Sequence, residues 1–597
     1  MRLTAMLLVL FAPAVFAAAP AAPADAGKTL REFFEAEWEW GLEEFPEGST
    51  YLGDRRYNDR LTDLSPEAIA RRKARRRETL ARLKAIDRAS LSAEDQLSYD
   101  LYVRQLETSI AGDRFPSELD PINQQSGIHQ EFAILSTVAP FRTAKDYRDY
   151  LARFAAFPKA IDQTIALMER GRQTGWILPA VPLRDVPASM KEQVHEAPEK
   201  SVHWKPFEKF PEAVPEAERE ALRSEARKRI AGDVIPAYRK LHGYFTGTYL
   251  PAARKDIGAW ALPNGAEFYA HEVKRYTTTN RTPEEIHKIG LSEVARIRKQ
   301  MEEIIRQVRF EGSFDDFTRF LRTDPRFYYK TAEDLLEGYR DICKRVDAEL
   351  PKMFWTLPRL PYGVIPTPEF EAPTSTTAYY RQGSREAARP GYFVANTYRL
   401  ETRPKYEMEA LAIHEAVPGH HLQIALAQEL EDLPKFRRHG FGFTAFVEGW
   451  GLYSESLGDE MGFYTDLYSK FGQLTYEMWR AVRLVVDTGM HAMRWDRQKA
   501  IDFMKSNTAK TEHDITVEID RYIVWPGQAL AYKIGELKIK ELRARATREL
   551  GDRFDVRRFH DAVLLGGALP LDPLEKRVDA WISEEKSKAP QGTPARS

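Results

Sequence analysis

The 597-residue sequence contains one cysteine, Cys343, so no disulfide can form within the chain and zinc sites built from several thiolates are excluded. An excess of charge of one sign is also missing, because 88 basic residues balance 89 acidic ones and give a formal net charge of −1. This balance gives no reason to expect nucleic acid or an anionic membrane surface as a partner. Hydrophobic residues make up 43% of the chain and charged residues 30%, which is typical of a globular protein with a large core.

The N-terminal residues have the features of an export signal. Arg2 precedes an apolar stretch from Met6 to Phe16, and small residues follow at the expected cleavage position. The apolar stretch is too short to span a bilayer permanently. No cysteine lies near the cleavage position, so we do not expect a lipid to be attached there. We therefore expect a signal peptide at residues 1–19, a flexible leader at 20–27, and secretion across the inner membrane to the periplasm without a stable membrane anchor.

Most of the remaining chain has helical periodicity. The run from Ile286 to Val308 places apolar residues three and four apart with charges between them, which predicts an amphipathic helix. The best strand candidates lie between Pro358 and Leu400, where Gly391 to Asn396 is expected to form a short strand. An edge strand at this place could bind an extended peptide by backbone pairing. Capping residues mark helix starts at Ser65-Pro66-Glu67, Thr143 with Asp146, Thr282-Pro283-Glu284-Glu285, and Thr331 with Asp334.

We expect a mainly α-helical fold with a small β-sheet. An N-terminal helical region at 28–178 and a catalytic helical domain at 218–583 are separated by residues 179–217, which are rich in Pro, Glu and Lys and have weak periodicity. We interpret this intervening segment as a surface excursion or lid. A disordered tail is expected at 584–597.

The stretch from Ala410 to Gln423 contains three histidines and one carboxylate within eight positions. Zinc binds neutral imidazoles and carboxylates, and His-Glu-x-x-His on a regular helix places two histidines on one face with a base between them. This chain begins the motif with His414 and Glu415, but Pro418 occupies the position of the second histidine. The second ligand must therefore come later.

Helix geometry bears on the choice between His420 and His421. At about 100° per residue, His420 lies roughly 120° from His414, whereas His421 returns to the same face two turns on, about 10.5 Å along the axis. Pro418 and Gly419 are expected to break the helix, so that a restarted turn could bring either histidine beside His414. We favour His420 as the second ligand and keep His421 as the alternative.

We expect Glu448 to be the third ligand. It follows the bulky apolar run from Phe443 to Val447, where an unpaired carboxylate would be costly to bury. Glu455, seven residues on and on about the same helix face, is an alternative ligand or a partner that orients a histidine, and Asp459 is a weaker candidate of the same kind. Glu415 would act as the general base towards a water whose pKa zinc lowers to about 7.

The stretches His414–Gln423 and Glu448–Glu455 resemble the bacterial family known as domain of unknown function 885 (DUF885). The resemblance covers nearly the whole mature chain, including Tyr276–Thr279 and Trp525–Gly535. That family looks similar to the helical gluzincin peptidases, such as angiotensin-converting enzyme and the thimet-type oligopeptidases, which carry a regular His-Glu-x-x-His and a later Glu ligand. The resemblance implies a large helical metallopeptidase-like fold with a deep active-site cleft, a Zn²⁺ cofactor and short peptides as substrates.

Further site residues are suggested around this motif. Tyr532 is similar in context to a thimet-type tyrosine that donates a hydrogen bond to the oxyanion, and Tyr522 is the competing donor. His491 could donate to the tetrahedral intermediate or orient a carboxylate, and Arg480 or Arg483 could hold a peptide C-terminal carboxylate. Packed tyrosines, a core histidine and ordinary ion pairs are the structural alternatives. The predicted catalytic residues are Glu415, Tyr532 and His491, and the predicted substrate-binding residues are Arg480, Tyr522 and Gln528.

These observations predict a zinc-dependent hydrolase, most specifically a peptidase acting on short peptides. One alternative is a zinc hydrolase of a non-peptide ester or amide, and another is a catalytically silent binding protein of the same fold. Glu415 beside His414 argues against the silent protein, because a purely structural metal site has no need of that base.

Overall fold

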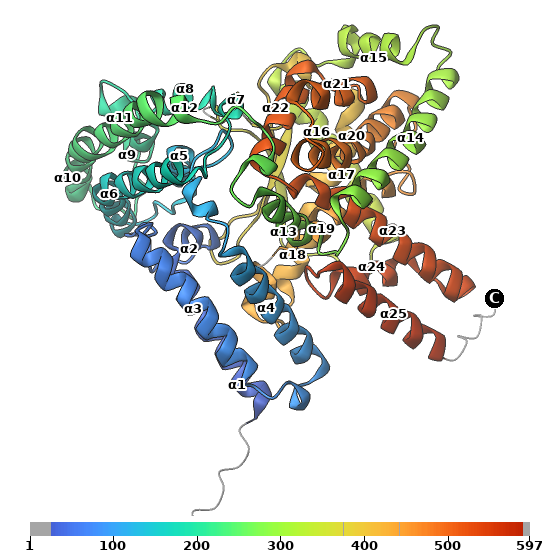
Figure 1. The fold of residues 1–597 in the computed structure, drawn as a ribbon, viewed down its shortest axis with the longest axis horizontal. Coiled ribbons are helices and arrows are strands. Elements are labelled where there is room, and N and C mark those ends of the chain that lie inside the picture. The colour runs from blue at the N-terminus through green and yellow to red at the C-terminus, as the bar shows by residue number, and fades with distance from the viewer. Residues whose placement is uncertain (1–24, 370, 374, 441, 589–597) are drawn as a thin grey trace, which may run out of the picture.

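Helices dominate this computed structural model, which describes residues 25–588 except 370, 374 and 441, and the expectation of a mainly α-helical fold is confirmed (Figure 1). Within that range, no helix combines the length and the apolar composition that a membrane crossing requires. The predicted signal peptide and the start of the predicted leader lie outside the described residues. Helix α1 (Ala26–Glu44) already begins inside the predicted leader, because Asp25 caps it by accepting hydrogen bonds from the Gly27 and Lys28 backbone N–H groups.

Two hydrophobic cores organise the helices. The larger core joins residues from both ends of the chain, Leu30 to Leu119 and Ile257 to Ile582, together with Leu167 and Trp176, and defines the main lobe. Its helices, besides α1, are α3 (Pro66–Lys84), α4 (Ala93–Gly112), α13 (Gly265–Thr277), α14 (Pro283–Gln307), α15 (Phe314–Thr323), α16 (Ala332–Met353), α17 (Met408–Glu415), α18 (His420–Glu429), α19 (Thr444–Leu457), α20 (Leu467–His491), α21 (Arg497–Asn507), α22 (Glu512–Val524), α23 (Ala531–Leu550), α24 (Val556–Leu564) and α25 (Leu571–Ser587). The short helix α2 (Pro46–Leu52) lies against α1 and α5 (Ile128–Val138).

The smaller core is built from Ile122 to Tyr249, and Val524 of α22 joins it. We call residues 122–254 the second lobe; it lies at the upper left of Figure 1, beside the main lobe. The predicted N-terminal region at 28–178 is thus divided between the two cores. Helices of the second lobe are α5 (Ile128–Val138), α6 (Ala144–Thr174), α7 (Ala180–Leu183), α8 (Val186–Lys191), α9 (Lys205–Glu208), α10 (Glu216–Arg229), α11 (Ile235–Tyr244) and α12 (Leu250–Ala252).

The segment 179–217, predicted as a surface excursion or lid, is packed into the second lobe instead. Trp204, Phe207 and Phe210 recur every three residues and are all buried there, and Phe207 stacks on Trp204 with ring centroids 6.0 Å apart. Prolines and charged residues dominate the composition of this segment. The apolar face formed by the three aromatic rings is therefore too short to be recognised from the sequence pattern. At the other end of the chain, α25 runs to Ser587, past the predicted start of the tail at 584, and residues 589–597 of that predicted tail lie outside the described residues.

The predicted helix starts are confirmed. Ser65 caps α3, Thr331 caps α16, and capping boxes formed by Thr143 with Asp146 and by Thr282 with Glu285 open α6 and α14. Helix α14 (Pro283–Gln307) is the predicted amphipathic helix, and its apolar face lies against α20.

A three-stranded sheet lies between α16 and α17 in the sequence, where the strands were predicted. Its strands are β1 (Tyr362–Pro366), β2 (Ala378–Arg381) and β3 (Gly391–Ala395), in the order β1-β3-β2. Strand β3 pairs in parallel with β1 and antiparallel with β2, so that Val394 lies opposite both Ile365 and Tyr379. This order makes β2 an edge strand of the sheet.

Candidate metal centre

The predicted break of the motif helix is confirmed. Helix α17 ends at Glu415, residues 416–419 form a turn that contains a cis peptide bond before Pro418, and α18 starts at His420. In this turn the Gly419 backbone N–H donates to the Ile413 carbonyl oxygen at 3.0 Å. A Cβ atom on Gly419 would lie 1.9 Å from the His414 carbonyl oxygen, so only glycine fits there. The turn brings the first residue of α18 back beside the last turn of α17.

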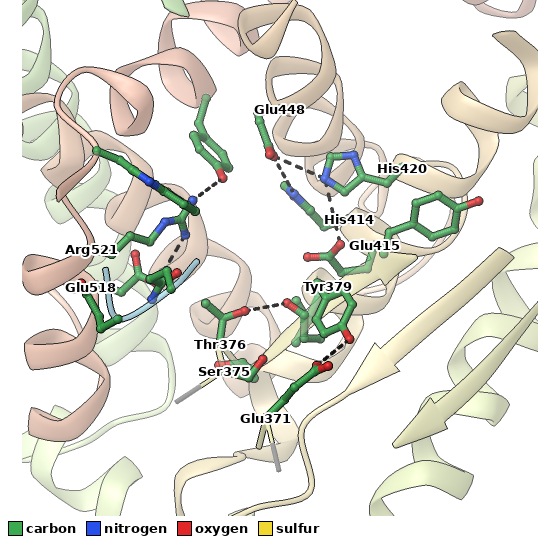
Figure 2. A pocket seen from close by; sticks show the side chains of 18 of the residues that line it. Glu371, Ser375, Thr376, Tyr379, His414, Glu415, His420, Glu448, Glu518 and Arg521 are labelled. Carbon is green, nitrogen blue, oxygen red and sulfur yellow. Dashed lines mark hydrogen bonds and ion pairs between the residues drawn. The ribbon is translucent and has the colours of Figure 1, made fainter. Parts of the chain in front are cut away.

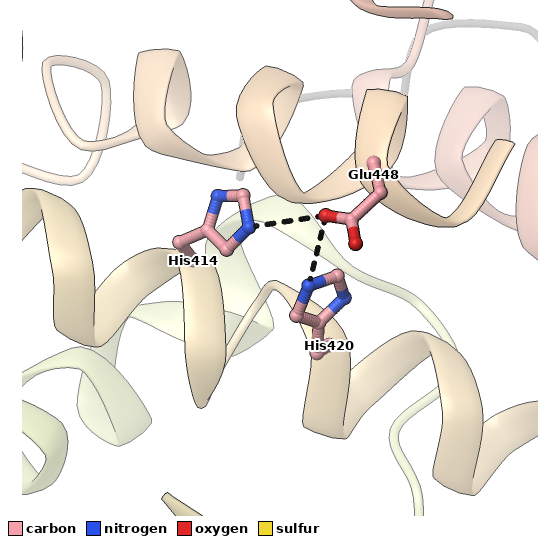
Figure 3. A group of neighbouring side chains, drawn as sticks. All are labelled: His414, His420 and Glu448. Atoms are coloured by element: carbon pink, nitrogen blue, oxygen red, sulfur yellow. Dashed lines mark ion pairs between the residues drawn. The ribbon is translucent and has the colours of Figure 1, made fainter. Parts of the chain in front are cut away.

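The turn places His414 and His420 around one carboxylate oxygen of Glu448 (Figure 3). One ligand atom from each of these three residues lies within 4.8 Å of the others. The Glu448 Oε2 atom is 3.6 Å from His414 Nε2 and 3.3 Å from His420 Nε2. Two ligands of a tetrahedral zinc ion at the usual 2.0–2.1 Å lie about 3.3 Å apart. The spacing of this metal cluster (His414, His420 and Glu448) therefore suits one zinc ion.

Helix α19 supplies the carboxylates of the site. Glu448 and Glu455 lie two turns apart on the helix face that meets His414, and Gly451 lies between them. A Cβ atom on Gly451 would lie 2.8 Å from Cε1 of His414, so glycine lets the helix approach the imidazole closely. The Trp450 indole N–H donates to the Pro418 carbonyl oxygen at 2.8 Å, which ties α19 to the turn between α17 and α18.

Glu455 lies on the far side of the His414 ring from Glu448. Its fully buried carboxylate lies 2.8 Å from His414 Nδ1 and 3.4 Å from Arg480 Nη2. Accepting the Nδ1 proton leaves Nε2 of His414 directed at His420 and Glu448, so Glu455 orients a candidate ligand and does not join the cluster. Asp459, the weaker candidate, forms an ion pair with Lys470 at 2.6 Å at the protein surface and is not in the cluster.

His420 is held from its other nitrogen by Gln423. The Gln423 amide N–H₂ lies 2.9 Å from His420 Nδ1 and donates to the Val447 carbonyl oxygen at 2.8 Å. A donor at Nδ1 favours the tautomer in which Nε2 carries the proton and donates to Glu448. Metal binding at Nε2 thus requires His420 to change tautomer and the Gln423 amide to reorient.

The residues of the metal cluster shift one another's pKa values. Burial opposes protonation of His414, but its bonds to Glu448 and Glu455 outweigh burial and raise the pKa of His414 to about 9. Burial also acts to raise the pKa of Glu448, yet the two histidines lower it well below its ordinary value. A zinc ion bound here would have to displace the His414 proton, so its affinity would fall as the pH falls.

Glu415 lies next to the metal cluster and lines the same cavity. Its Oε2 atom is 4.0 Å from His420 Nε2, and its side chain is nearly buried. Burial raises the pKa of Glu415, and the neighbouring His414 and His420 offset only part of this effect. The carboxyl group is therefore shifted towards the pH range in which it can both take and give a proton.

His421, the alternative second ligand, does not reach the cluster. Its Nδ1 is 3.0 Å from the Tyr380 hydroxyl and its Nε2 is 2.9 Å from the Leu360 carbonyl oxygen. Burial lowers its pKa to about 4, so the ring is neutral. The restarted helix turns this side chain towards the sheet, which corrects the inclusion of His421 among the metal ligands.

A cavity of about 480 Å³ opens beside the metal cluster, between the two lobes. Strand β2 and Glu371 border it on one side, and α20 and α22 border it on another. Figure 2 shows Glu518 and Arg521 of α22 across the cavity from the metal cluster and Glu415. The predicted residues Arg480, Arg483 and Tyr532 also line this cavity, and the Tyr532 hydroxyl accepts a hydrogen bond from Arg521 Nη2 at 3.1 Å.

Three predicted residues do not line the cavity. His491 accepts from the Ala259 backbone N–H at 2.9 Å and lies 2.9 Å from the Tyr522 carbonyl oxygen, so both ring nitrogens are engaged by backbone. Tyr522 is buried, and its hydroxyl accepts from Arg483 Nε at 2.7 Å. Gln528 accepts from Arg521 at 3.0 Å. Tyr522 and Gln528 support the arginines of the cavity, and His491 is a core histidine.

Sequence reasoning missed other residues of the cavity. Glu518 and Arg521 are charged residues on a helix whose apolar face is Ile515, Ile519 and Ile523. Charged residues next to such an apolar face are the sequence pattern that could have identified them. The second lobe adds a mostly uncharged polar surface for which no motif exists. Its members are Gln124, Gln125, His129, Gln130, Ser189 and Gln193, with the acidic Glu192 beside them.

Comparison with known proteins finds similar sequences and folds for most of the chain. Residues 46–578 match the sequence model of a family described as "Bacterial protein of unknown function (DUF885)". No functionally curated protein matches the chain. A crystal structure described as that of "the putative lipoprotein from Colwellia psychrerythraea" has 28% sequence identity and a TM-score of 0.88, and the match covers 94% of this chain and 100% of that one. A structure of "a putative lipoprotein of unknown function from Shewanella oneidensis" has 18% identity and a TM-score of 0.66, covers 92% and 99% of the two chains, and shows the fold alone.

Proposed function

The chain belongs to the DUF885 family, and from its buried metal cluster beside Glu415 we propose that it is a zinc-dependent hydrolase that cleaves short peptides. The observation that carries this proposal is the set of three ligand atoms spaced as zinc requires, next to a carboxyl group that is not itself needed as a ligand. Two imidazoles and one carboxylate are also the donor set that catalytic zinc sites use, with a fourth position left for water.

Each residue of the site has a role in the proposed reaction. Bound zinc would lower the pKa of a water molecule towards about 7 and polarise the substrate carbonyl. Glu415 takes the proton from the attacking water and delivers it to the leaving amine, since its carboxylate lines the cavity beside the metal cluster. Glu455 holds the His414 ring in place through Nδ1. The Tyr532 hydroxyl, which accepts from Arg521, keeps its own proton available for the oxyanion that develops during attack.

The edge strand supports a peptide as the substrate. Ala378, Tyr379 and Tyr380 of β2 line the cavity, and β3 covers only one edge of β2. An extended peptide that paired with the other edge of β2 would run past the metal cluster and satisfy its own backbone groups. A zinc hydrolase of a non-peptide ester or amide remains the alternative function, because the same zinc chemistry acts on those bonds.

Export is part of this proposal. Residues 1–19 have the pattern of a signal peptide, and both similar structures carry the description "putative lipoprotein", so we propose that the protein works in the periplasm. Cys343, the one cysteine of the sequence, is buried in α16 and does not offer a site for a lipid.

Replacement of Glu415 with Gln tests the proposed function. The E415Q variant should bind zinc as the parent protein does, while the rate of peptide hydrolysis falls about 10²- to 10⁴-fold, the usual contribution of a general base. The matched control is E431Q, because the Glu431 side chain is 70% exposed at the surface. Zinc content by elemental analysis and turnover of a short-peptide panel are measured together. Unchanged turnover in E415Q would refute the mechanism, and turnover of esters without peptides would favour the alternative hydrolase.

A further inference from the structure

Three arginines gather on the side of the cavity formed by α20 and α22. Arg480 and Arg483 project from α20, Arg521 projects from α22, and Glu518 lies among them. The exposed fractions of the four residues are 4%, 2%, 9% and 3%, respectively. We call these four residues the arginine cluster. Buried guanidinium groups need anionic partners, because an unpaired charge is costly to remove from water.

The acidic residues in contact with the arginine cluster do not balance it. Glu518 is shared between Arg483 at 3.0 Å and Arg521 at 3.6 Å. Arg480 contacts Glu455 at 3.4 Å, and that carboxylate also accepts from His414. Two carboxylates therefore serve three guanidinium groups and one imidazole.

Part of the hydrogen-bonding capacity of the cluster is also unused. In the described part of the chain, the buried Nη1 of Arg483 has no hydrogen-bond partner, and neither does Nε of Arg480 or Arg521. All three side chains line the cavity, so a ligand there can contact the guanidinium groups, although these three nitrogens have almost no accessible surface of their own. The forked geometry of a guanidinium group matches a planar carboxylate better than it matches a neutral carbonyl.

Building on the proposed function, we propose that the arginine cluster binds the free C-terminal carboxylate of the substrate, so that the protein cleaves peptides close to their C-terminal end. The cluster is almost fully buried and lines the cavity, so a carboxylate bound there would be largely removed from water. Figure 2 shows Arg521 across the cavity from the metal cluster, so the two sites can hold different parts of one short ligand. An acidic side chain offers the same carboxylate chemistry, and the experiment has to separate the two sources.

Binding of three dipeptides separates these sources without any requirement for turnover. Isothermal titration calorimetry of the zinc-loaded E415Q protein would compare Ala-Ala, Ala-Ala amide and Ala-Glu amide. Loss of a charge-assisted hydrogen bond should weaken binding about tenfold or more, so Ala-Ala should bind at least about tenfold more tightly than either amide. Equal binding of Ala-Ala and its amide would overturn the proposal, and so would tighter binding of Ala-Glu amide than of Ala-Ala.

Variants connect the preference to the arginine cluster. R483Q and R521Q should each reduce the preference for Ala-Ala over its amide about tenfold, while R521K, which keeps the charge, should retain part of it. The matched control is R497Q, because Arg497 pairs with Asp520 of α22 at 2.7 Å and does not line the cavity. Thermal unfolding checks that each variant is folded. Retention of the full preference in both R483Q and R521Q would overturn the assignment.

Hydrolysis distinguishes failure of this inference from failure of the proposed function. The parent protein is given a free-acid tetrapeptide and the same peptide as its C-terminal amide, and kcat/KM is measured for both. A decrease of about tenfold or more for the amide is expected. Equal hydrolysis of both peptides would refute the inference and leave the peptidase proposal intact. If neither peptide is hydrolysed but the dipeptide preference persists, the peptidase proposal fails and the carboxylate site stands.

Discussion

Replacement of Glu455 with Gln tests how the site holds His414. Glu455 is fully buried, and its carboxylate accepts the His414 Nδ1 proton at 2.8 Å. Gln has the same size and can still accept this bond, but the bond changes from charge-assisted to neutral. The difference between these two kinds of bond is about 1–2 kcal/mol, which corresponds to a loss in zinc affinity of about 5- to 30-fold.

E448Q is the matched comparison, because Glu448 and Glu455 both lie on α19. Glu448 faces the Nε2 atom of His414, whereas Glu455 faces the Nδ1 atom. E448Q removes a charged ligand, so its loss in zinc affinity should exceed about 100-fold, the upper range for residues that only support a ligand. Competition with a chromogenic zinc chelator at pH 7.5 measures both variants. E460Q is the control, since Glu460 pairs with Arg543 in a partly exposed ion pair at 2.7 Å.

Two results would refute this reasoning. An unchanged zinc affinity in E455Q would mean that the bond to His414 does not support the ligand. A loss in E455Q as large as that in E448Q would mean that Glu455 is a ligand itself. Because Glu455 also lies 3.4 Å from Arg480, thermal unfolding of E455Q has to show that the variant keeps its fold.

Two further predictions concern histidines. H420A should lose zinc, measured by elemental analysis, whereas H421A should keep it, because the His421 nitrogens contact the Tyr380 hydroxyl and the Leu360 carbonyl oxygen. Zinc retained in H420A would contradict the metal cluster. Acid should destabilise the fold below about pH 6.5, because burial lowers the pKa values of four buried imidazoles besides that of His421, and the unfolded chain binds their protons first. At pH 5 each one costs about 2 kcal/mol, and a melting temperature that stays constant from pH 7 to 5 would contradict this. The four imidazoles are those of His129, His203, His491 and His560, with pKa values of about 3, 3, 4 and 3.

Local signals in the sequence predicted local structure well. Thr282 with Glu285 opens α14 as a capping box, and Gly391 begins β3, because capping and strand propensity depend on residues close in the chain. The same kind of signal failed for 179–217. There the apolar face is only three aromatic residues long, and its burial depends on α6 and α10, which no local pattern reveals.

The identity of the residues at the metal cluster was accessible from the sequence, but their roles were not. A carboxylate such as Glu448 after a run of bulky apolar residues has to be paired wherever it is buried, so its chemistry is a property of the chain. Whether Glu455 is a ligand or supports one depends on which nitrogen of His414 it contacts, and that depends on how α19 packs against α17.

The sequence by itself determined that this protein is mainly helical, that its motif helix breaks at Pro418 and Gly419, and that His414, Glu415 and Glu448 are the residues to examine. These conclusions follow from helical periodicity, backbone sterics and the cost of burying charge, all of which act over a few residues. Only the tertiary structure decided between His420 and His421, because one residue of helix rotation, about 100°, separates a side chain that faces the cluster from one that faces the sheet. It alone assembled the arginine cluster, since α20 and α22 meet through packing between segments that the sequence keeps apart.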